Sequence, residues 1–174
     1  MSRTLALSAA ALTVAAALST TACAHAEPEP PPSGPSETTA PQPDSPCAAV
    51  LAGALTPADP AQVGNNRRLL HCADGTWQTF SDPYPSSDRW LSTGPELILH
   101  GQGRRNPEAA AGTWAATPQT AEAHCSVEVV DVLAAGRTSE PQTLTAAPGQ
   151  PLTFEVSDHM FTMKLSGYCL WARS

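Results

Sequence analysis

The fold of this chain is decided by residues 125–171, which read CSVEVVDVLAAGRTSEPQTLTAAPGQPLTFEVSDHMFTMKLSGYCLW. Apolar and polar residues alternate along three of its segments, residues 125–129, 152–156 and 161–165. Such alternation is typical of antiparallel strands that bury one face and expose the other to solvent. A cysteine stands near each end, so we expect a β unit whose first and last strands are joined covalently.

Two irregularities are expected within this unit. Residues 130–132 continue the first strand with the apolar phase shifted, which predicts a β-bulge. Residues 148–149, Pro-Gly, predict a turn before the second strand. In the last strand, Phe161, Met163 and Leu165 are expected on the buried face. Several short strands at this spacing favour a mainly β fold, a small antiparallel β-sandwich or an open barrel.

Upstream of this unit, residues 45–55 predict one short helix of about two turns. Ser45 suits the N-cap and Pro46 the first helical position, and Pro57 ends the helix. The apolar residues at helical spacing are Cys47, Val50, Leu51, Ala54 and Leu55.

A β-hairpin is expected next. Residues 67–73 and 76–80 read as strands, and Asp-Gly at 74–75 favours a type I′ turn between them. Residues 81–95 are rich in proline and predict a loop, and residues 96–100 predict a short buried strand.

The N-terminus has the layout of an export signal. Arg3 provides a positive charge, and residues 5–18 are apolar but shorter than the roughly 20 residues that span a bilayer. The following Ser19-Thr20-Thr21-Ala22-Cys23 resembles a bacterial lipoprotein signal, in which a small residue precedes the cysteine. This resemblance implies that Cys23 carries the lipid and anchors the chain to the outer face of the bacterial cytoplasmic membrane.

A different cleavage site is also present. Residues 24–26, Ala-His-Ala, fit signal peptidase cleavage after Ala26, which would give a soluble secreted protein. Residues 24–46 are rich in proline and poor in large apolar residues, so they predict a disordered linker reaching up to roughly 70 Å. We therefore expect a signal peptide over residues 1–22, a lipid-anchored linker over 23–46 and one β-rich domain over 47–174.

The five cysteines favour this layout, because lipidation of Cys23 leaves an even number. Four cysteines allow three pairings, and we favour Cys47–Cys72 with Cys125–Cys169. The first pair would fix the helix to the hairpin, and the second would join the first and last strands of the C-terminal unit. Loop-closure entropy gives contributions of about 3.5 and 4 kcal/mol. The two crossed pairings remain open at this point.

Metal and catalytic sites find little support in the sequence. A zinc site is disfavoured because neighbouring residues on a strand point to opposite faces, and its candidate ligands are His71, Cys72, His124 and Cys125. No nucleophile elbow, metalloprotease pair, phosphate loop or dinucleotide motif occurs. A serine–histidine–aspartate set can be written only from the scattered residues Ser87, His100 and Asp88. We expect no cofactor, and the net charge of −7 argues against a nucleic-acid partner.

The strongest cluster of chemical groups is expected at His100, Arg104 and Arg105, facing Arg89 and Trp90. Glycines between these residues expose backbone N–H groups, and arginines bind carboxylates and phosphates through two parallel hydrogen bonds. One interpretation is a site for an anionic ligand, such as a phospholipid headgroup or an envelope glycan.

The alternative is a solvated turn, whose arginines pair with Asp88 or Glu108. The tryptophans pose a similar choice between a ligand groove and the core, and we favour the core. They are Trp77, Trp90, Trp114 and Trp171.

The order of segments resembles that of actinobacterial envelope lipoproteins of unassigned function. The C-terminal half also resembles a module that recurs in them. The residues that carry this second resemblance are Gly112, Thr113, Trp114, Cys125, Phe161, Ser166, Gly167, Cys169 and Trp171. The resemblance implies a location and no activity.

Three functions are compatible with these expectations. The first is a surface-tethered, non-catalytic binding or structural module whose partner is an envelope lipid, a glycan or another envelope protein. The second is a carrier of a lipid or another hydrophobic molecule, which needs an interior cavity of several hundred Å³. The third is a small hydrolase, which needs a buried histidine bonded to both a serine and a carboxylate.

Overall fold

The computed structural model describes residues 40–62, 67–94, 96–101 and 105–174. The expected signal peptide, Cys23, the linker through residue 39, and Arg104 lie outside the described residues. The described part of the chain holds no helix of the length and apolarity needed to cross a bilayer.

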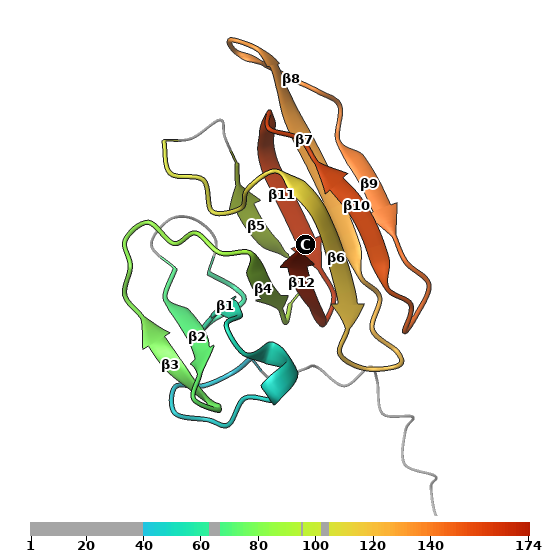
Figure 1. The fold of residues 1–174 in the computed structure, drawn as a ribbon. Coiled ribbons are helices and arrows are strands. Elements are labelled where there is room, and N and C mark those ends of the chain that lie inside the picture. The colour runs from blue at the N-terminus through green and yellow to red at the C-terminus, as the bar shows by residue number, and fades with distance from the viewer. Residues whose placement is uncertain (1–39, 63–66, 95, 102–104) are drawn as a thin grey trace, which may run out of the picture. The chain divides into compact units, whose positions relative to one another are not determined.

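Two β-sheets build the domain (Figure 1). The strands of the seven-stranded sheet, in spatial order, are β10 (Leu152–Val156), β6 (Gly112–Pro118), β12 (Cys169–Arg173), β4 (Arg89–Ser92), β1 (Leu55–Pro57), β2 (Leu69–Ala73) and β3 (Thr76–Phe80). Those of the five-stranded sheet are β5 (Leu97–His100), β11 (Met160–Ser166), β7 (Ser126–Ala134), β8 (Arg137–Thr138) and β9 (Gln142–Thr145), which also pairs with β7. Neighbours are antiparallel except β1 and β4, which run parallel at Leu55 and Trp90. Neither sheet closes into a barrel in the described residues, and the expected mainly β fold is confirmed as two sheets.

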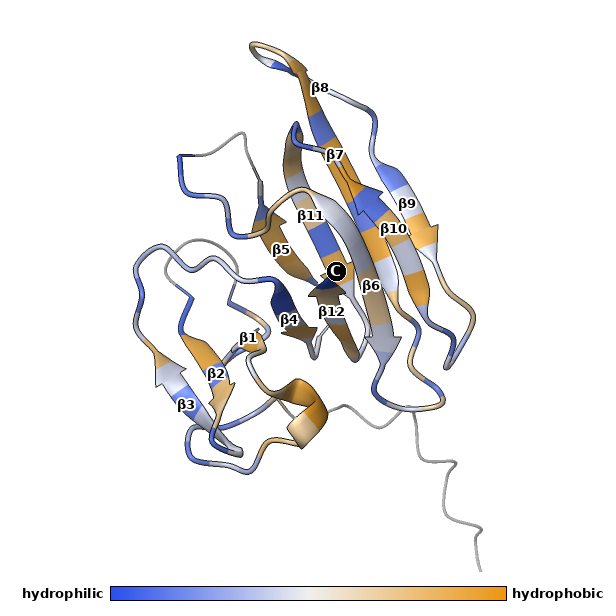
Figure 2. Ribbon diagram, viewed as in Figure 1, coloured by the Kyte–Doolittle hydropathy of each residue, from blue (hydrophilic) through white to orange (hydrophobic). Residues whose placement is uncertain are grey.

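The main core lies between the two sheets and draws on both. Figure 2 shows polar residues interrupting the apolar ones along β7, which buries Val127 in this core. Trp90, Trp114 and Trp171 of the larger sheet are completely buried, and they meet apolar residues of β5, β7 and β11. The smaller sheet contributes Leu97, Leu99, Val127, Met160, Met163 and Leu165. The expectation that tryptophans fill the core is confirmed.

A second apolar cluster covers the opposite face of the larger sheet. Leu70 and Cys72 of β2, Leu91 of β4 and Leu170 of β12 pack there against the segment that precedes β1. This segment also pairs with the edge strand β3, since the Asp44 N–H donates to the Trp77 carbonyl at 2.7 Å. The ordered domain therefore begins at or before Asp44, within the expected linker. The middle of the seven-stranded sheet is buried on both faces.

The disulfides are those favoured from the sequence, Cys47–Cys72 and Cys125–Cys169, with Cα–Cα separations of 6.0 and 5.9 Å. The first joins the N-terminal segment to β2 inside the second cluster. The second runs from the residue before β7 to β12, so it links the two sheets within the main core.

The Asp-Gly hairpin between β2 and β3 is also confirmed. Asp74 and Gly75 have φ of 52° and 78°, as both central residues of a type I′ turn require. Gly167, between β11 and β12, has φ of 91°, and a Cβ there would overlap the His124 carbonyl oxygen. Only glycine fits this second turn.

The helix is shorter than two turns. It is one 3-10 turn, η1 (Ala49–Leu51), and Ser45 bonds the Gln42 carbonyl instead of capping it. The residues that follow η1 form backbone hydrogen bonds with β2. The Gly53 N–H donates to the Cys72 carbonyl at 2.9 Å, and Leu55 begins β1. Pairing with β2 thus satisfies backbone groups that a longer helix would have bonded internally.

One segment of the larger sheet differs from expectation. Residues 89–92, expected in a loop, form β4 between β12 and β1. Residues 112–118, for which no element was expected, form β6. Trp90 enters the main core and Leu91 the second cluster. A short strand buried on both faces shows no alternation, which explains why the sequence pattern did not reveal β4.

The expected bulge lies next to its predicted position but on the partner strand. Met160 pairs with Asp131 and Thr162 with Val130, so Phe161 is the extra residue, on β11. Its insertion turns Met160 into the core and leaves Phe161 36 % exposed. The expectation that Phe161 is buried with Met163 and Leu165 is therefore wrong. A further register shift between Val132 and Ala134 affects the pairing of β7 with β8.

Candidate functional site

The expected ligand-binding residues do not form one group. Trp90 is fully buried in the core, so its ring is not a ligand contact, and this prediction is wrong. Arg89, its neighbour on β4, bonds the Val50 carbonyl at 2.7 Å on the side of the second cluster. His100 and Arg105 instead line a common cleft, and Arg104 lies outside the described residues.

This cleft has a volume of about 660 Å³, and we call it the arginine cleft. Its walls come from the start of β2, from the end of β3 with the following loop, and from the end of β5 with the following loop. The lining residues are Arg67, Arg68, Leu69, Phe80, Ser81, Asp82, Pro83, Tyr84, Pro85, His100, Arg105, Asn106 and Glu108. Its size is typical of small-molecule sites, about 300–1,000 Å³.

Glu108 is the central polar residue of the cleft. One of its carboxylate oxygens accepts from the Arg67 guanidinium, and the other accepts from the His100 backbone N–H at 2.9 Å. The second oxygen also lies 2.7 Å from His100 Nδ1. An ionised carboxylate only accepts hydrogen bonds, so Nδ1 carries a proton in this arrangement. Glu108 was expected to pair with an arginine of the turn. It does pair with an arginine, but that arginine is Arg67, which lies outside the turn.

Arg67 is fixed by contacts of both its terminal guanidinium nitrogens, whereas its Nε has no hydrogen-bond partner among the described residues. Its side chain is only 4 % exposed, and it also donates to the Ile98 carbonyl at 2.8 Å. Its guanidinium carbon lies 5.7 Å from the ring centre of Trp90, a cation–π distance. Burial lowers the pKa of the Arg67 guanidinium from its ordinary value, and the charge of Glu108 opposes this shift. Arginine nevertheless stays charged at neutral pH, so the wall contains a buried ion pair.

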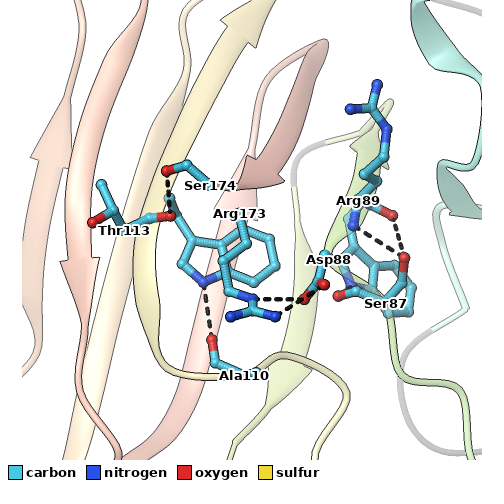
Figure 3. A network of polar contacts seen from close by, with 9 residues as sticks. Ser87, Asp88, Arg89, Ala110, Thr113, Arg173 and Ser174 are labelled. Atoms are coloured by element: carbon cyan, nitrogen blue, oxygen red, sulfur yellow. Dashed lines mark hydrogen bonds and ion pairs between the residues drawn. The ribbon is translucent and has the colours of Figure 1, made fainter.

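Two buried tryptophans hold the loops next to the cleft at Ser87 and Ala110, both of which are labelled in Figure 3. The Trp90 indole N–H donates to the Ser87 carbonyl and that of Trp114 to the Ala110 carbonyl, each at 3.0 Å. Trp90 therefore acts as a support for the cleft, although it does not line it.

Arg173, near the C-terminus, bonds the loop that contains Ser87 and Asp88. Arg173 binds both carboxylate oxygens of Asp88, at 2.6 and 2.9 Å, as Figure 3 shows. The bond from Arg173 holds the pKa of Asp88 below its ordinary 3.8. Together with the tryptophan bonds, this pair holds Ser87, Asp88 and Ala110, which lie close in sequence to the lining residues Pro85 and Glu108.

The rim of the cleft is more exposed. Arg68 and Arg105 are both exposed, and neither has a carboxylate partner among the described residues. Asp82 accepts the Tyr84 N–H at 2.8 Å, which shapes the loop that carries Tyr84. Tyr84 is 65 % exposed and lines the cleft. The rim therefore presents two exposed guanidinium groups and one exposed aromatic ring.

The serine–histidine–aspartate set written from the sequence is not assembled. Ser87 bonds the backbone of Arg89, Asp88 bonds Arg173, and His100 bonds Glu108. Of the possible zinc ligands, Cys72 and Cys125 belong to different disulfides. Among the described residues, no group of three or more histidine, cysteine or acidic side chains is placed to hold a metal.

A second cleft, of about 490 Å³, lies where β9 and β10 border the sandwich. Its apolar lining is Val129, Leu144, Phe154 and Val156, and its polar lining is Asp131, Gln142, Glu155 and Ser157. We call it the β9–β10 cleft.

Sequence reasoning missed Arg67 as a site residue. It stands at the polar start of a predicted strand, and no local motif distinguishes it from Arg68. Its partners Ile98 and Glu108 are 31 and 41 residues away, so only the tertiary fold identifies it. Comparison of the chain with protein-family models, curated proteins and solved structures finds no match.

Proposed function

We propose that this protein is exported, anchored by a lipid on Cys23 to the outer face of the cytoplasmic membrane, and acts there as a non-catalytic binding module. The arginine cleft is its ligand site. The observation that carries this proposal is the combination of a fixed wall, Arg67–Glu108–His100, with the exposed rim residues Arg68, Arg105 and Tyr84.

The wall favours binding because it is already ordered. Both carboxylate oxygens of Glu108 are bonded, and the neighbouring loops are held by Trp90, Trp114 and Arg173. A site that is ordered before binding loses little conformational entropy when the ligand arrives. Arg68 and Arg105, in contrast, are exposed and have no carboxylate partner in the described part of the chain, so they can exchange water for a ligand.

A lipid carrier is the second candidate, and the β9–β10 cleft is the observation in its favour. Four apolar residues line this cleft, and Leu144 is 46 % exposed. Two carboxylates, Asp131 and Glu155, share the same lining and are unfavourable neighbours for an acyl chain. The main core is filled by three fully buried tryptophans, so binding at the arginine cleft has the stronger support.

Native mass spectrometry of the full-length protein, purified from its own envelope in mild detergent, tests the proposal. We expect a bound envelope molecule on the wild type and its loss from Tyr84→Ala and Arg105→Ala. The matched control is Arg137→Ala, which removes an exposed arginine of β8 outside the cleft. Retention of the same molecule by all three variants would contradict the proposed site. Its loss only from Leu144→Asp would support the carrier instead.

A further inference from the structure

We infer that the arginine cleft recognises an acidic saccharide, with the sugar ring against Tyr84 and the anionic group between Arg68 and Arg105. This inference rests on the proposed function and specifies its ligand. Three features of the cleft carry it: its charge, its aromatic and proline surfaces, and its polar side chains.

The charge of the cleft is opposite to that of the chain. The protein has 16 acidic and only nine basic residues, yet three of the nine line this one cleft. Arg67 is neutralised by Glu108, which leaves Arg68 and Arg105 against the single carboxylate of Asp82. Arginine forks match carboxylate and phosphate oxygens through paired hydrogen bonds. The local charge therefore selects an anionic group.

The apolar part of the lining suits the face of a sugar ring. Tyr84 is exposed between Pro83 and Pro85, and Phe80 is partly buried beside it in the same wall. The Phe80 ring is held by an edge-to-face contact with His71, at 5.9 Å between ring centres. An exposed aromatic ring that is not needed for the core offers a rigid, flat surface at a small cost in conformational entropy.

Polar side chains around this surface match hydroxyl groups. Asp82 uses one oxygen for the Tyr84 N–H, and its carboxylate keeps further acceptor capacity. Ser81 and Asn106 add hydroxyl and amide groups to the lining. A saccharide presents many hydroxyls as both donors and acceptors, so it can satisfy this mixed set, which an acyl chain cannot.

An anionic membrane surface is a poorer occupant. The net charge of the chain is −7, which opposes approach to anionic lipids, and a bilayer surface is contacted by an exposed basic face. The arginines here line a cleft together with Asp82 and Glu108. A single acidic sugar unit can enter such a cleft, whereas a membrane surface cannot.

Isothermal titration calorimetry on the intact domain tests the inference with defined probes. The probes are tetragalacturonate, glucose 6-phosphate, the neutral maltotetraose, and phosphatidylglycerol vesicles. We expect at least one acidic saccharide to bind at least about tenfold more tightly than maltotetraose, with an affinity that falls as NaCl is raised. The tighter of the two acidic saccharides identifies carboxylate or phosphate as the anionic group. Arg105→Ala and Tyr84→Ala should each weaken binding about tenfold, and Arg137→Ala should leave it unchanged.

Three results would overturn the inference. Equal binding of maltotetraose would remove the acidic requirement, and unchanged affinity of both cleft variants would place the sugar elsewhere. Binding to none of the saccharides, or only to phosphatidylglycerol vesicles, would exclude the ligand class. In that last case, a different molecule lost from the cleft variants in native mass spectrometry would leave the binding function standing. Thermal melting of each variant confirms that the exposed substitutions preserve the fold.

Discussion

Glu108 joins parts of the chain that are far apart in sequence. Arg67 precedes β2, His100 ends β5, and both contact the same carboxylate. Removal of one member of a buried ion pair is costly because the remaining charge has no partner in a poorly solvated site.

We therefore expect Glu108→Ala to lower the free energy of unfolding by about 3 kcal/mol. Urea denaturation followed by tryptophan fluorescence measures this loss. The double variant Arg67→Met/Glu108→Leu should recover part of it, because apolar residues replace both charges while the His100 donors still lose their acceptor. Glu122→Ala, which removes an exposed carboxylate, is the matched control. If Glu108→Ala and Glu122→Ala unfold alike, the Arg67–Glu108–His100 network does not stabilise the domain.

Asp88 gives a pH-dependent prediction. Its pKa is lowered in the folded state by the hydrogen bonds from Arg173, so the bond stabilises the fold above the ordinary aspartate pKa. This contribution is lost as the pH falls through the lowered value. The urea midpoint of Asp88→Asn should lie below that of the wild type at pH 7, and the two should converge below pH 3.8, the ordinary value. A constant difference across this range would show that charge is not the cause.

For single residues, a position could be predicted where it depends on neighbours in the sequence, and could not be predicted where it depends on distant segments. The turn glycine Gly75 and the four paired cysteines follow from local geometry and count, and the structure agrees. The orientation of Phe161 was not predictable, because one inserted residue reverses the alternation. Arg67 was missed because its partners come from distant loops.

Strands with a local sequence signal were predicted, and a strand without one was missed. The hairpin β2–β3 and strands β7, β10 and β11 have clear alternation or turn signals, and they were predicted. β4 lies between β12 and β1 with Trp90 on one face and Leu91 on the other, so it has no polar side to reveal it. Because β4 was not recognised, Arg89 and Trp90 were expected beside His100 and Arg105, but they lie outside the cleft lining.

The two disulfides should have different roles. Cys125–Cys169 closes a separation of 44 residues and joins the sheets, whereas Cys47–Cys72 closes 25 and fixes the N-terminal segment. Loop-closure entropy predicts losses of about 4 and 3.5 kcal/mol when each pair is replaced by alanine. Urea denaturation of the two double variants measures these losses.

We also expect a qualitative difference between the two variants. Without Cys47–Cys72, the N-terminal segment should become accessible to protease while near-ultraviolet circular dichroism still reports the packed tryptophans. Without Cys125–Cys169, both signals should be lost together, because Cys125 and Cys169 belong to the main core. Identical behaviour of the two variants would contradict the division into two apolar clusters.

For the whole molecule, the described residues form one two-sheet domain, and its attachment to the membrane remains a prediction from residues 1–26. Cys23→Ala should move the full-length protein from the membrane fraction to the medium, because the lipid is the expected anchor. Cell fractionation and immunoblotting measure this shift, with Cys23→Ser as a second variant that cannot be lipidated through sulfur. Unchanged membrane retention of both variants would exclude the lipid anchor.

The central claim, that the arginine cleft is the ligand site, is tested most directly by amide chemical-shift mapping. The ¹⁵N-labelled domain, residues 40–174, is titrated with the soluble glycan fraction of its own envelope. We predict that the largest shifts cluster at Arg68, Tyr84 and Arg105, and that in Arg105→Ala the same shifts need about tenfold more ligand. Shifts confined to Val129, Leu144 and Phe154 of the β9–β10 cleft, or shifts that need no more ligand in Arg105→Ala, would contradict the account.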